Sequence, residues 1–155
     1  MYDSELYGTE LYEKLGIDAE GEHVPHLLIN KLPHPAYDPR GYHPGPLKVT
    51  HRLQGGDTIE VGGRTLTVLH LPGHTPGCIA LHEERTGALY SGDVIYNGHL
   101  IDDLPELDRS SYRHSMQHPT GLDVSIVHPG HGRSFGPRRL RELTLGYLCG
   151  ITRIN

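Results

Sequence analysis

The sequence is poor in the features that would tie it to a membrane, to nucleic acid or to an oxidising compartment. No apolar stretch approaches the roughly 20 residues of a transmembrane helix, and residues 1–10 are too acidic for a signal peptide. A net charge of −5 argues against binding to nucleic-acid phosphates, and the arginines within residues 133–141 are expected to be solvated. Cys78 and Cys149 lie far apart without a CxxC spacing, which is typical of unpaired thiols in a reducing compartment. We therefore predict a cytoplasmic protein with no nucleic-acid partner and no membrane span.

Glycine and proline are abundant instead, with 20 and 12 residues in a chain of 155, and they predict a fold rich in turns. The pattern changes near residue 50. Before it, we expect a helix within residues 2–15 and then a Pro- and His-rich connector over residues 20–50. So long an irregular connector is unusual inside a compact domain. We therefore expect residues 1–50 to pack against something outside this chain, and residues 51–155 to form the folded unit.

Residues 51–155 predict an α+β fold. Apolar runs bounded by turn residues predict strands over residues 58–61, 65–71, 78–82, 88–91 and 124–128. Helices are predicted over residues 108–117 and 137–148. The apolar face of the second helix is expected to consist of Leu140, Leu143, Leu145, Tyr147 and Leu148. The order is ββββαβα, which describes half of a sandwich, and His70 and Cys78 are expected to be buried in its sheet.

Three short loops carry residue types that bind metals. They are Leu71-Pro72-Gly73-His74-Thr75-Pro76-Gly77, Ser91-Gly92-Asp93 and His128-Pro129-Gly130-His131-Gly132. Each follows an apolar run and sets a histidine or an aspartate beside glycine, where the backbone can turn sharply. Taken singly, each loop also has a plain structural explanation. His74 could face solvent in a turn, Asp93 could form an Asx turn, and His131 could be a histidine whose hydrogen bonds are satisfied. Taken together, three strand-end ligands of the types that zinc accepts predict a metal site.

In this order, the three loops resemble the second half of the metallo-β-lactamase-fold hydrolase signature, of the glyoxalase II-like kind. Residues 89–102 are also similar to a subgroup of acyl-CoA thioesterases on this fold. The resemblance implies an αββα sandwich that holds two metal ions, usually zinc, and acts on a small acyl substrate. It implies that His74 binds one metal, that His131 binds the other, and that Asp93 bridges them as the catalytic carboxylate. A water molecule activated by the metals would be the nucleophile.

One part of the family pattern is absent from this sequence. The remaining ligands of the family come from a His-x-His-x-Asp-His motif, and no such string occurs here. The nearest spacing, His23-Val24-Pro25-His26, has a proline between the histidines and no neighbouring aspartate. We therefore expect a chain truncated at its start that holds one zinc ion or none, with iron(II) as the alternative for a two-histidine, one-carboxylate set.

Other side chains are weaker candidates. Tyr96, Asn97 and His99 follow the aspartate loop and are predicted to contact the substrate, although a plain loop explains them equally well. His128 is expected near the site or at the surface rather than as a ligand. Ser134 has no base predicted beside it, so no serine-nucleophile site is expected.

Two functions follow from this sequence. The first is a metal-dependent hydrolase that acts on thioesters or related acyl compounds. The second is a non-catalytic, truncated or split domain that needs a partner half. A half-sandwich would leave Leu66, Val68, Ile79 and Leu81 under-covered, and exposing several hundred Å² of apolar surface costs on the order of 10 kcal/mol, comparable to the whole stability of a domain. We therefore expect self-association through this face, or pairing with the missing N-terminal half.

Overall fold

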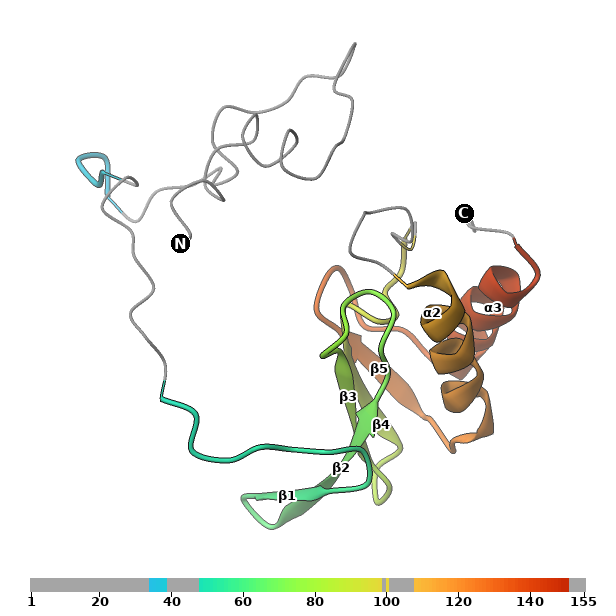
Figure 1. Ribbon diagram of the computed structural model, residues 1–155, viewed down its shortest axis with the longest axis horizontal. Coiled ribbons are helices and arrows are strands. Elements are labelled where there is room, and N and C mark those ends of the chain that lie inside the picture. The colour runs from blue at the N-terminus through green and yellow to red at the C-terminus, as the bar shows by residue number, and fades with distance from the viewer. Residues whose placement is uncertain (1–33, 39–47, 99, 101–107, 151–155) are drawn as a thin grey trace. The chain divides into compact units, whose positions relative to one another are not determined.

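The computed structural model describes residues 34–38, 48–98, 100 and 108–150 (Figure 1). The chain divides into two compact units, Met1–Thr50 and His51–Asn155. In the first unit, residues 34–37 form a turn, in which the Tyr37 amide donates to the His34 carbonyl oxygen over 2.9 Å. The helix predicted within residues 2–15 and most of the predicted connector lie outside the described residues.

The second unit contains a five-stranded sheet in the order β1-β2-β3-β4-β5. Strands β1 to β4 pair with one another antiparallel, and β5 runs parallel to β4. The elements are β1 (Thr58–Val61), β2 (Arg64–His70), β3 (Ile79–Glu83), β4 (Ala88–Gly92), α2 (Arg109–Gln117), the 3-10 helix η3 (His118–Gly121), β5 (Ile126–Pro129) and α3 (Pro137–Leu148). This order confirms the predicted α+β class and the predicted ββββαβα sequence of elements.

Glycines set the first hairpin. Gly62 and Gly63 join β1 to β2 with φ of 55° and 77°, the left-handed region that two-residue hairpin turns require and that glycine adopts without strain. A turn also precedes β1, in which the Asp57 carboxylate accepts a 2.7 Å bond from the Gln54 amide. Local turn chemistry therefore determines the start of the sheet.

The fifth strand begins two residues later than the sequence predicts. Val124 is buried but precedes the strand, and pairing with β4 begins with Ala88 opposite Ile126. The amides of Ser125 and Ile126 both donate to the Gly87 carbonyl oxygen, at 2.8 and 3.3 Å. Because those bonds anchor the chain at the turn between β3 and β4, the parallel ladder can start only after them.

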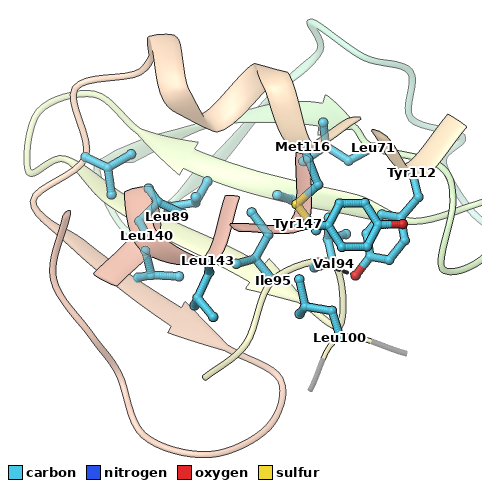
Figure 2. Close-up of a cluster of buried hydrophobic side chains, with 13 residues drawn as sticks. Leu71, Leu89, Val94, Ile95, Leu100, Tyr112, Met116, Leu140, Leu143 and Tyr147 are labelled. Atoms are coloured by element: carbon cyan, nitrogen blue, oxygen red, sulfur yellow. Dashed lines mark hydrogen bonds between the residues drawn. The ribbon is translucent and has the colours of Figure 1, made fainter. Parts of the chain in front are cut away.

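Both helices cover one face of the sheet (Figure 1). Residues paired across neighbouring strands share a face, so Leu69 lies with Ala80 and Leu89 lies with Val127. These residues belong to or pack against the main apolar cluster, which Tyr112, Met116, Leu140, Leu143 and Tyr147 complete from the helices (Figure 2). The core thus lies between this face and the helices α2 and α3.

The ends and faces of the helices follow from their sequences. Asp108 caps α2 by accepting bonds from the amides of Ser110 and Ser111. The hydroxyl and amide of Ser111 hold the pKa of the Asp108 carboxyl below its usual value. In α3, Leu140, Leu143 and Tyr147 are buried as predicted, but the prediction for Leu145 was wrong, since it is 54% exposed. At 100° per residue, Leu145 lies 200° around the helix from Leu143, on the solvent side.

Two expectations for the sheet need correction. His70 is exposed rather than buried, and its Nε2 lies 3.0 Å from the Pro76 carbonyl oxygen, because it ends β2 where the chain turns. Cys78 is only half-buried and precedes β3. Both cysteines are free thiols, as predicted.

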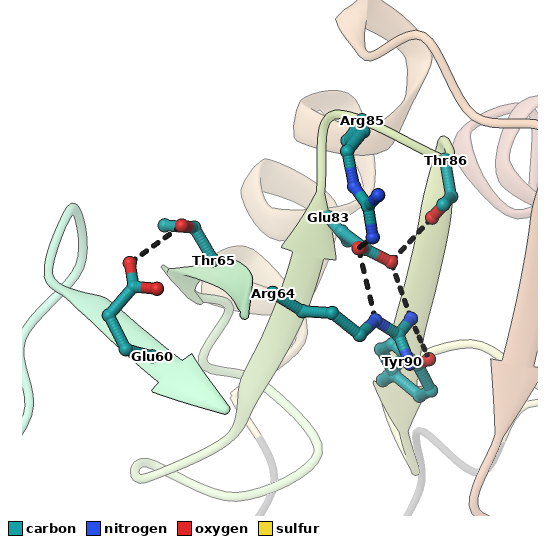
Figure 3. A network of polar contacts seen from close by, with 7 residues as sticks. All are labelled: Glu60, Arg64, Thr65, Glu83, Arg85, Thr86 and Tyr90. Carbon is teal, nitrogen blue, oxygen red and sulfur yellow. Dashed lines mark hydrogen bonds and ion pairs between the residues drawn. The ribbon is translucent and has the colours of Figure 1, made fainter. Parts of the chain in front are cut away.

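An ion-pair network ties β2, β3 and β4 together on the face away from the helices (Figure 3). Arg64 donates through Nε and Nη2 to the two carboxylate oxygens of Glu83, and Nη2 also donates to the Tyr90 hydroxyl over 2.9 Å. The Glu83 side chain is only 1% exposed. The guanidinium of Arg64 and the hydroxyl of Thr86 lower the pKa of Glu83 to about 2.

Candidate functional site

The three candidate ligands follow strands that point in the same direction. His74 follows β2, Asp93 follows β4 and His131 follows β5. Because β2 and β4 are each antiparallel to β3, and β5 is parallel to β4, the carboxyl ends of these three strands meet at one edge of the sheet. The topology therefore brings all three loops to the same edge.

Two of the three side chains are in contact. The Nε2 atom of His131 lies 3.2 Å from Oδ1 of Asp93, which is ion-pair distance when the imidazole is protonated. Their side chains are 71% and 41% exposed, so the pair lies open at the edge of the sheet. An aspartate oxygen and an imidazole nitrogen held together in this way can bind a cation or hold a proton between them.

Backbone contacts fix this pair. The Gly130 amide donates to the Gly92 carbonyl oxygen over 2.7 Å, which joins the two loops directly. A side chain at position 130 would collide with the Asp93 carboxylate. Glycine is therefore needed at this position because of close approach, at a φ that does not itself demand it.

The loop over residues 128–134, which carries His131, is closed at its base. Val127 and Phe135 exchange two backbone bonds of 2.8 and 3.1 Å. Next to them, His128 Nδ1 lies 2.8 Å from the Ser134 hydroxyl, and the His128 ring stacks on Tyr90. The expectation that Ser134 has no base beside it was wrong, because the short loop folds back and brings residues 128 and 134 together.

The loop of His74 is held between the sheet and α2. The Ser115 hydroxyl donates to the Pro72 carbonyl oxygen over 2.6 Å, and the Asp108 amide donates to the Gly73 carbonyl oxygen over 3.1 Å. Gly73, with a φ of 140°, lies directly against Tyr112 at the start of α2. The His74 Nδ1 atom is buried and has no hydrogen-bond partner in the part of the chain that the structure describes.

These residues fit a metal in donor type but not in number. Carboxylate and imidazole suit zinc or iron, and the orphaned nitrogen of His74 marks a ligand-type group without a protein partner among the described residues. Within those same residues, however, no three His, Cys, Asp or Glu side chains come together. The strand β3 separates β2 from β4, so two spacings of about 4.8 Å divide the His74 loop from the Asp93 loop. A catalytic zinc needs three protein ligands, and the contact seen between the described residues supplies two.

The predicted substrate residues fall into two groups. Tyr96 lies beside His131, with ring centroids 6.1 Å apart and the planes at 79°. The amide oxygen of Asn97 accepts a 2.9 Å bond from Arg139 Nε, which anchors the loop after Asp93 to α3. The third residue, His99, lies outside the described residues. The sequence did not single out Arg139 for this role, because only the fold brings α3 beside residue 97.

Comparison with known proteins identifies the class of this fold and site. A sequence profile described as the metallo-beta-lactamase superfamily matches residues 7–131. The chain is 40% identical over 125 residues to the acyl-coenzyme A thioesterase MBLAC2 of Gallus gallus, covering 77% of this chain and 45% of that protein. It is 46% identical over 48 residues to the hydroxyacylglutathione hydrolase of Hyphomonas neptunium, covering 31% of this chain and 19% of that one.

Solved structures agree with the sequence matches. A metallo-beta-lactamase family protein of Thermus thermophilus, TTHA1429, superposes with a TM-score of 0.56 at 23% identity, over 67% of this chain and 37% of that chain. The di-iron-bound form of TTHA1623 superposes with a TM-score of 0.52 at 28% identity, over 90% of this chain and 61% of that one.

This chain belongs to the metallo-beta-lactamase superfamily and has its mixed α+β fold. It spans less than half the length of the thioesterase that it matches over most of its own length.

Proposed function

We propose that this chain is a metal-dependent hydrolase that acts on acyl thioesters, and that His74, Asp93 and His131 are its share of the metal site. The observation that carries the proposal is the contact between Asp93 and His131 at the end of two parallel strands. The similarity to an acyl-coenzyme A thioesterase over 77% of the chain supports the thioester as the substrate class. Similarity to a hydroxyacylglutathione hydrolase supports the same bond type.

Asp93 and His131 would hold one metal ion between them, and His74, from the same edge of the sheet, would bind the other. When bound, the metal would supply a Lewis acid and lower the pKa of water. The chain's own contribution is positioning. The absence of a side chain at Gly130 leaves room for the Asp93 carboxylate, and the bond from the Gly130 amide to the Gly92 carbonyl oxygen holds the two loops together. Tyr96 borders His131 and is proposed to lie against the acyl group.

The experiment is turnover of a short acyl-CoA and of an acyl-glutathione by the purified chain, with added zinc or iron(II). Asp93→Ala removes the carboxylate and is expected to lower kcat/KM by at least a hundredfold. Asp123→Ala is the matched control, because Asp123 is an exposed aspartate next to a different turn. Turnover that is equal in the two variants, or that survives a metal chelator unchanged, would contradict the proposal.

A second function is favoured by the incomplete ligand set. No group of three ligand side chains forms within the described residues, and the sequence has no His-x-His-x-Asp-His string. A non-catalytic or split domain that works only with a partner half fits that observation. Metal content separates the two functions. Bound metal together with turnover would favour the hydrolase, and the absence of both metal and turnover would favour the split domain.

No helix within the described part of the chain is long and apolar enough to cross a membrane. The two free cysteines support our proposal of a cytoplasmic location, because paired cysteines are typical of oxidising compartments. A reactive-thiol count on protein taken directly from cells would test it, with two free thiols expected.

A further inference from the structure

Two histidines outside the candidate metal site lie on one face of α2. His114 is in the last turn of the helix, and His118 is its C-cap residue. The backbone of His118 keeps helical angles, with φ of −59° and ψ of −51°, so the two residues are four positions apart on a continuous helical path. Side chains at this spacing are neighbours on the surface of a helix. The two rings are in contact, with centroids 5.6 Å apart and the planes at 79°.

The ring nitrogens of this pair are available to a ligand. Both residues are exposed, and within the described part of the chain their side chains interact only with each other. By contrast, His70, His82 and His128 each have a ring nitrogen at hydrogen-bond distance from an oxygen. The neighbouring cation, Arg113, donates to the Leu148 carbonyl oxygen over 2.9 Å, which ties its side chain to the end of α3. The pair therefore presents to solvent two imidazoles that no other group of the described residues uses.

The distance between the two rings suits a single metal ion. Imidazole nitrogens bind zinc at about 2.0–2.1 Å, and two rings at a tetrahedral angle on one ion then have centroids roughly 5 Å apart. The observed separation of 5.6 Å differs from this by about half an ångström, which small rotations within the side-chain rotamer wells can supply. Imidazole ligands suit zinc, iron, nickel and copper. The chemistry of the pair therefore selects a divalent transition-metal ion.

The position of the pair on the helix also favours a cation. The last carbonyl groups of an α-helix have no intrahelical donors, and they give this end of the helix a partial negative charge. An ion held by both rings would link two successive turns at this end. Because the ion binds the folded helix and not the unfolded chain, it would stabilise the folded state.

The pair lies toward the opposite edge of the sheet from the candidate metal site. Helix α2 begins beside the first metal loop, where the Asp108 amide donates to the Gly73 carbonyl oxygen over 3.1 Å. Its other end leads through η3 to Asp123, whose carbonyl oxygen lies 3.3 Å from Nε2 of His82. His82 is near the far end of β3, which runs away from the edge that carries the candidate ligands. A metal ion at the end of α2 would therefore be separate from one bound at that edge.

We propose that His114 and His118 form a second metal site, which binds a divalent transition-metal ion such as zinc or nickel through one nitrogen of each ring. Two protein ligands leave the other coordination positions to water, so the ion is exchangeable, unlike the four-ligand zinc of a structural site. This proposal is independent of the proposed activity, because it uses none of the candidate ligands at the other edge of the sheet.

The test is a titration of the full chain with Ni²⁺, followed in amide NMR spectra, because this paramagnetic ion broadens the signals of the residues around it. In the wild type, the amide signals of residues 113–118 are expected to broaden together. His114→Ala and His118→Ala should each raise the dissociation constant for this group by about tenfold or more, because the second ligand of a chelate acts at a high effective concentration. Both positions are exposed and alanine favours helix, so both variants are expected to fold, which far-UV spectra verify.

The matched control is a double substitution, His114→Gln with Gln117→His. It keeps the number of histidines in the chain but places the two histidines of this helix at consecutive positions, which do not face each other. It is expected to weaken binding as much as His114→Ala does.

Three results would overturn the proposal. One is that the signals of residues 113–118 stay sharp throughout the titration of the wild type. Another is that His114→Ala leaves their broadening unchanged. The third is that the double-substitution variant binds as tightly as the wild type, which would mean that the number of exposed histidines, and not their spacing, attracts the ion. Broadening near Asp93 is a separate signal in the same spectra, so the candidate site is tested on its own.

Discussion

The amide of Gly130 donates a 2.7 Å hydrogen bond to the carbonyl oxygen of Gly92. This bond joins the loop after β5 to the loop after β4, and it brings His131 to 3.2 Å from Asp93. The candidate site therefore depends on a backbone contact between two parallel strands as much as on its side chains.

Gly130→Ala tests that dependence. The added methyl group would meet the Asp93 carboxylate, so one loop must move, at a cost of about 1–3 kcal/mol in unfolding free energy. We expect chemical denaturation to show this loss and metal binding to weaken. Gly136→Ala is the control, because its added methyl group meets nothing within 4 Å. Equal stability of the two variants would show that the contact is dispensable.

Ser134→Ala removes the side-chain bond that reinforces the closed base of the His131 loop. The Ser134 hydroxyl lies 2.8 Å from His128 Nδ1, and losing one such bond costs about 0.5–1.5 kcal/mol. Amide hydrogen exchange of Gly130 should become faster, because the loop opens more often. Ser134→Thr keeps the hydroxyl and should restore protection. If the exchange rate of the Gly130 amide is unchanged in the alanine variant, Ser134 does not stabilise this loop.

Tyr112→Phe tests how the core supports the loop after Asp93. The buried Tyr112 hydroxyl donates to the Val94 carbonyl oxygen over 2.6 Å. Removing the hydroxyl leaves that buried carbonyl without this donor, and we expect a loss of about 1–3 kcal/mol. Thermal or urea unfolding measures it. Tyr90→Phe, at a half-buried hydroxyl bonded to Arg64, should cost less, and the reverse order would contradict this account.

Glu83 predicts an acid-dependent stability. Its pKa is lowered from 4.5 to about 2 by Arg64 and Thr86, so folding favours the charged carboxylate. That contribution is complete above about pH 4.5 and is lost as the pH falls toward 2. We expect Glu83→Gln to be less stable than the wild type at neutral pH. When the pH falls from about 4.5 to 2, its melting temperature should fall by less than that of the wild type. Glu84→Gln, at an exposed neighbour, should follow the wild-type curve. Parallel curves for all three proteins would show that Glu83 does not titrate with folding.

Local patterns predicted most of the fold. The apolar runs bounded by turn residues indicated the element order and most element bounds within one residue. The misses have non-local causes. The start of β5 depends on bonds to Gly87, and the exposure of Leu145 depends on which side of α3 meets the sheet.

The site was predictable only in part. The ligand types and their order indicated one edge, and the strand directions agree with that. The sequence could not indicate how far the His74 loop lies from the Asp93 loop. The strand β3 separates them, and its place in the sheet is decided by long-range pairing. The bonds of His128 to Ser134 and of Arg139 to Asn97 likewise arise from the folded arrangement alone.

Metal stoichiometry of the purified chain tests the central claim most directly. Elemental analysis after dialysis against zinc or iron(II) should find at least one ion per chain in the wild type. Asp93→Ala, His131→Ala and His74→Ala should each lower the number of bound ions, and Asp123→Ala should leave it unchanged. A folded wild type that binds no metal, or that binds the same amount without Asp93, would contradict the assignment of this edge of the sheet as a metal site.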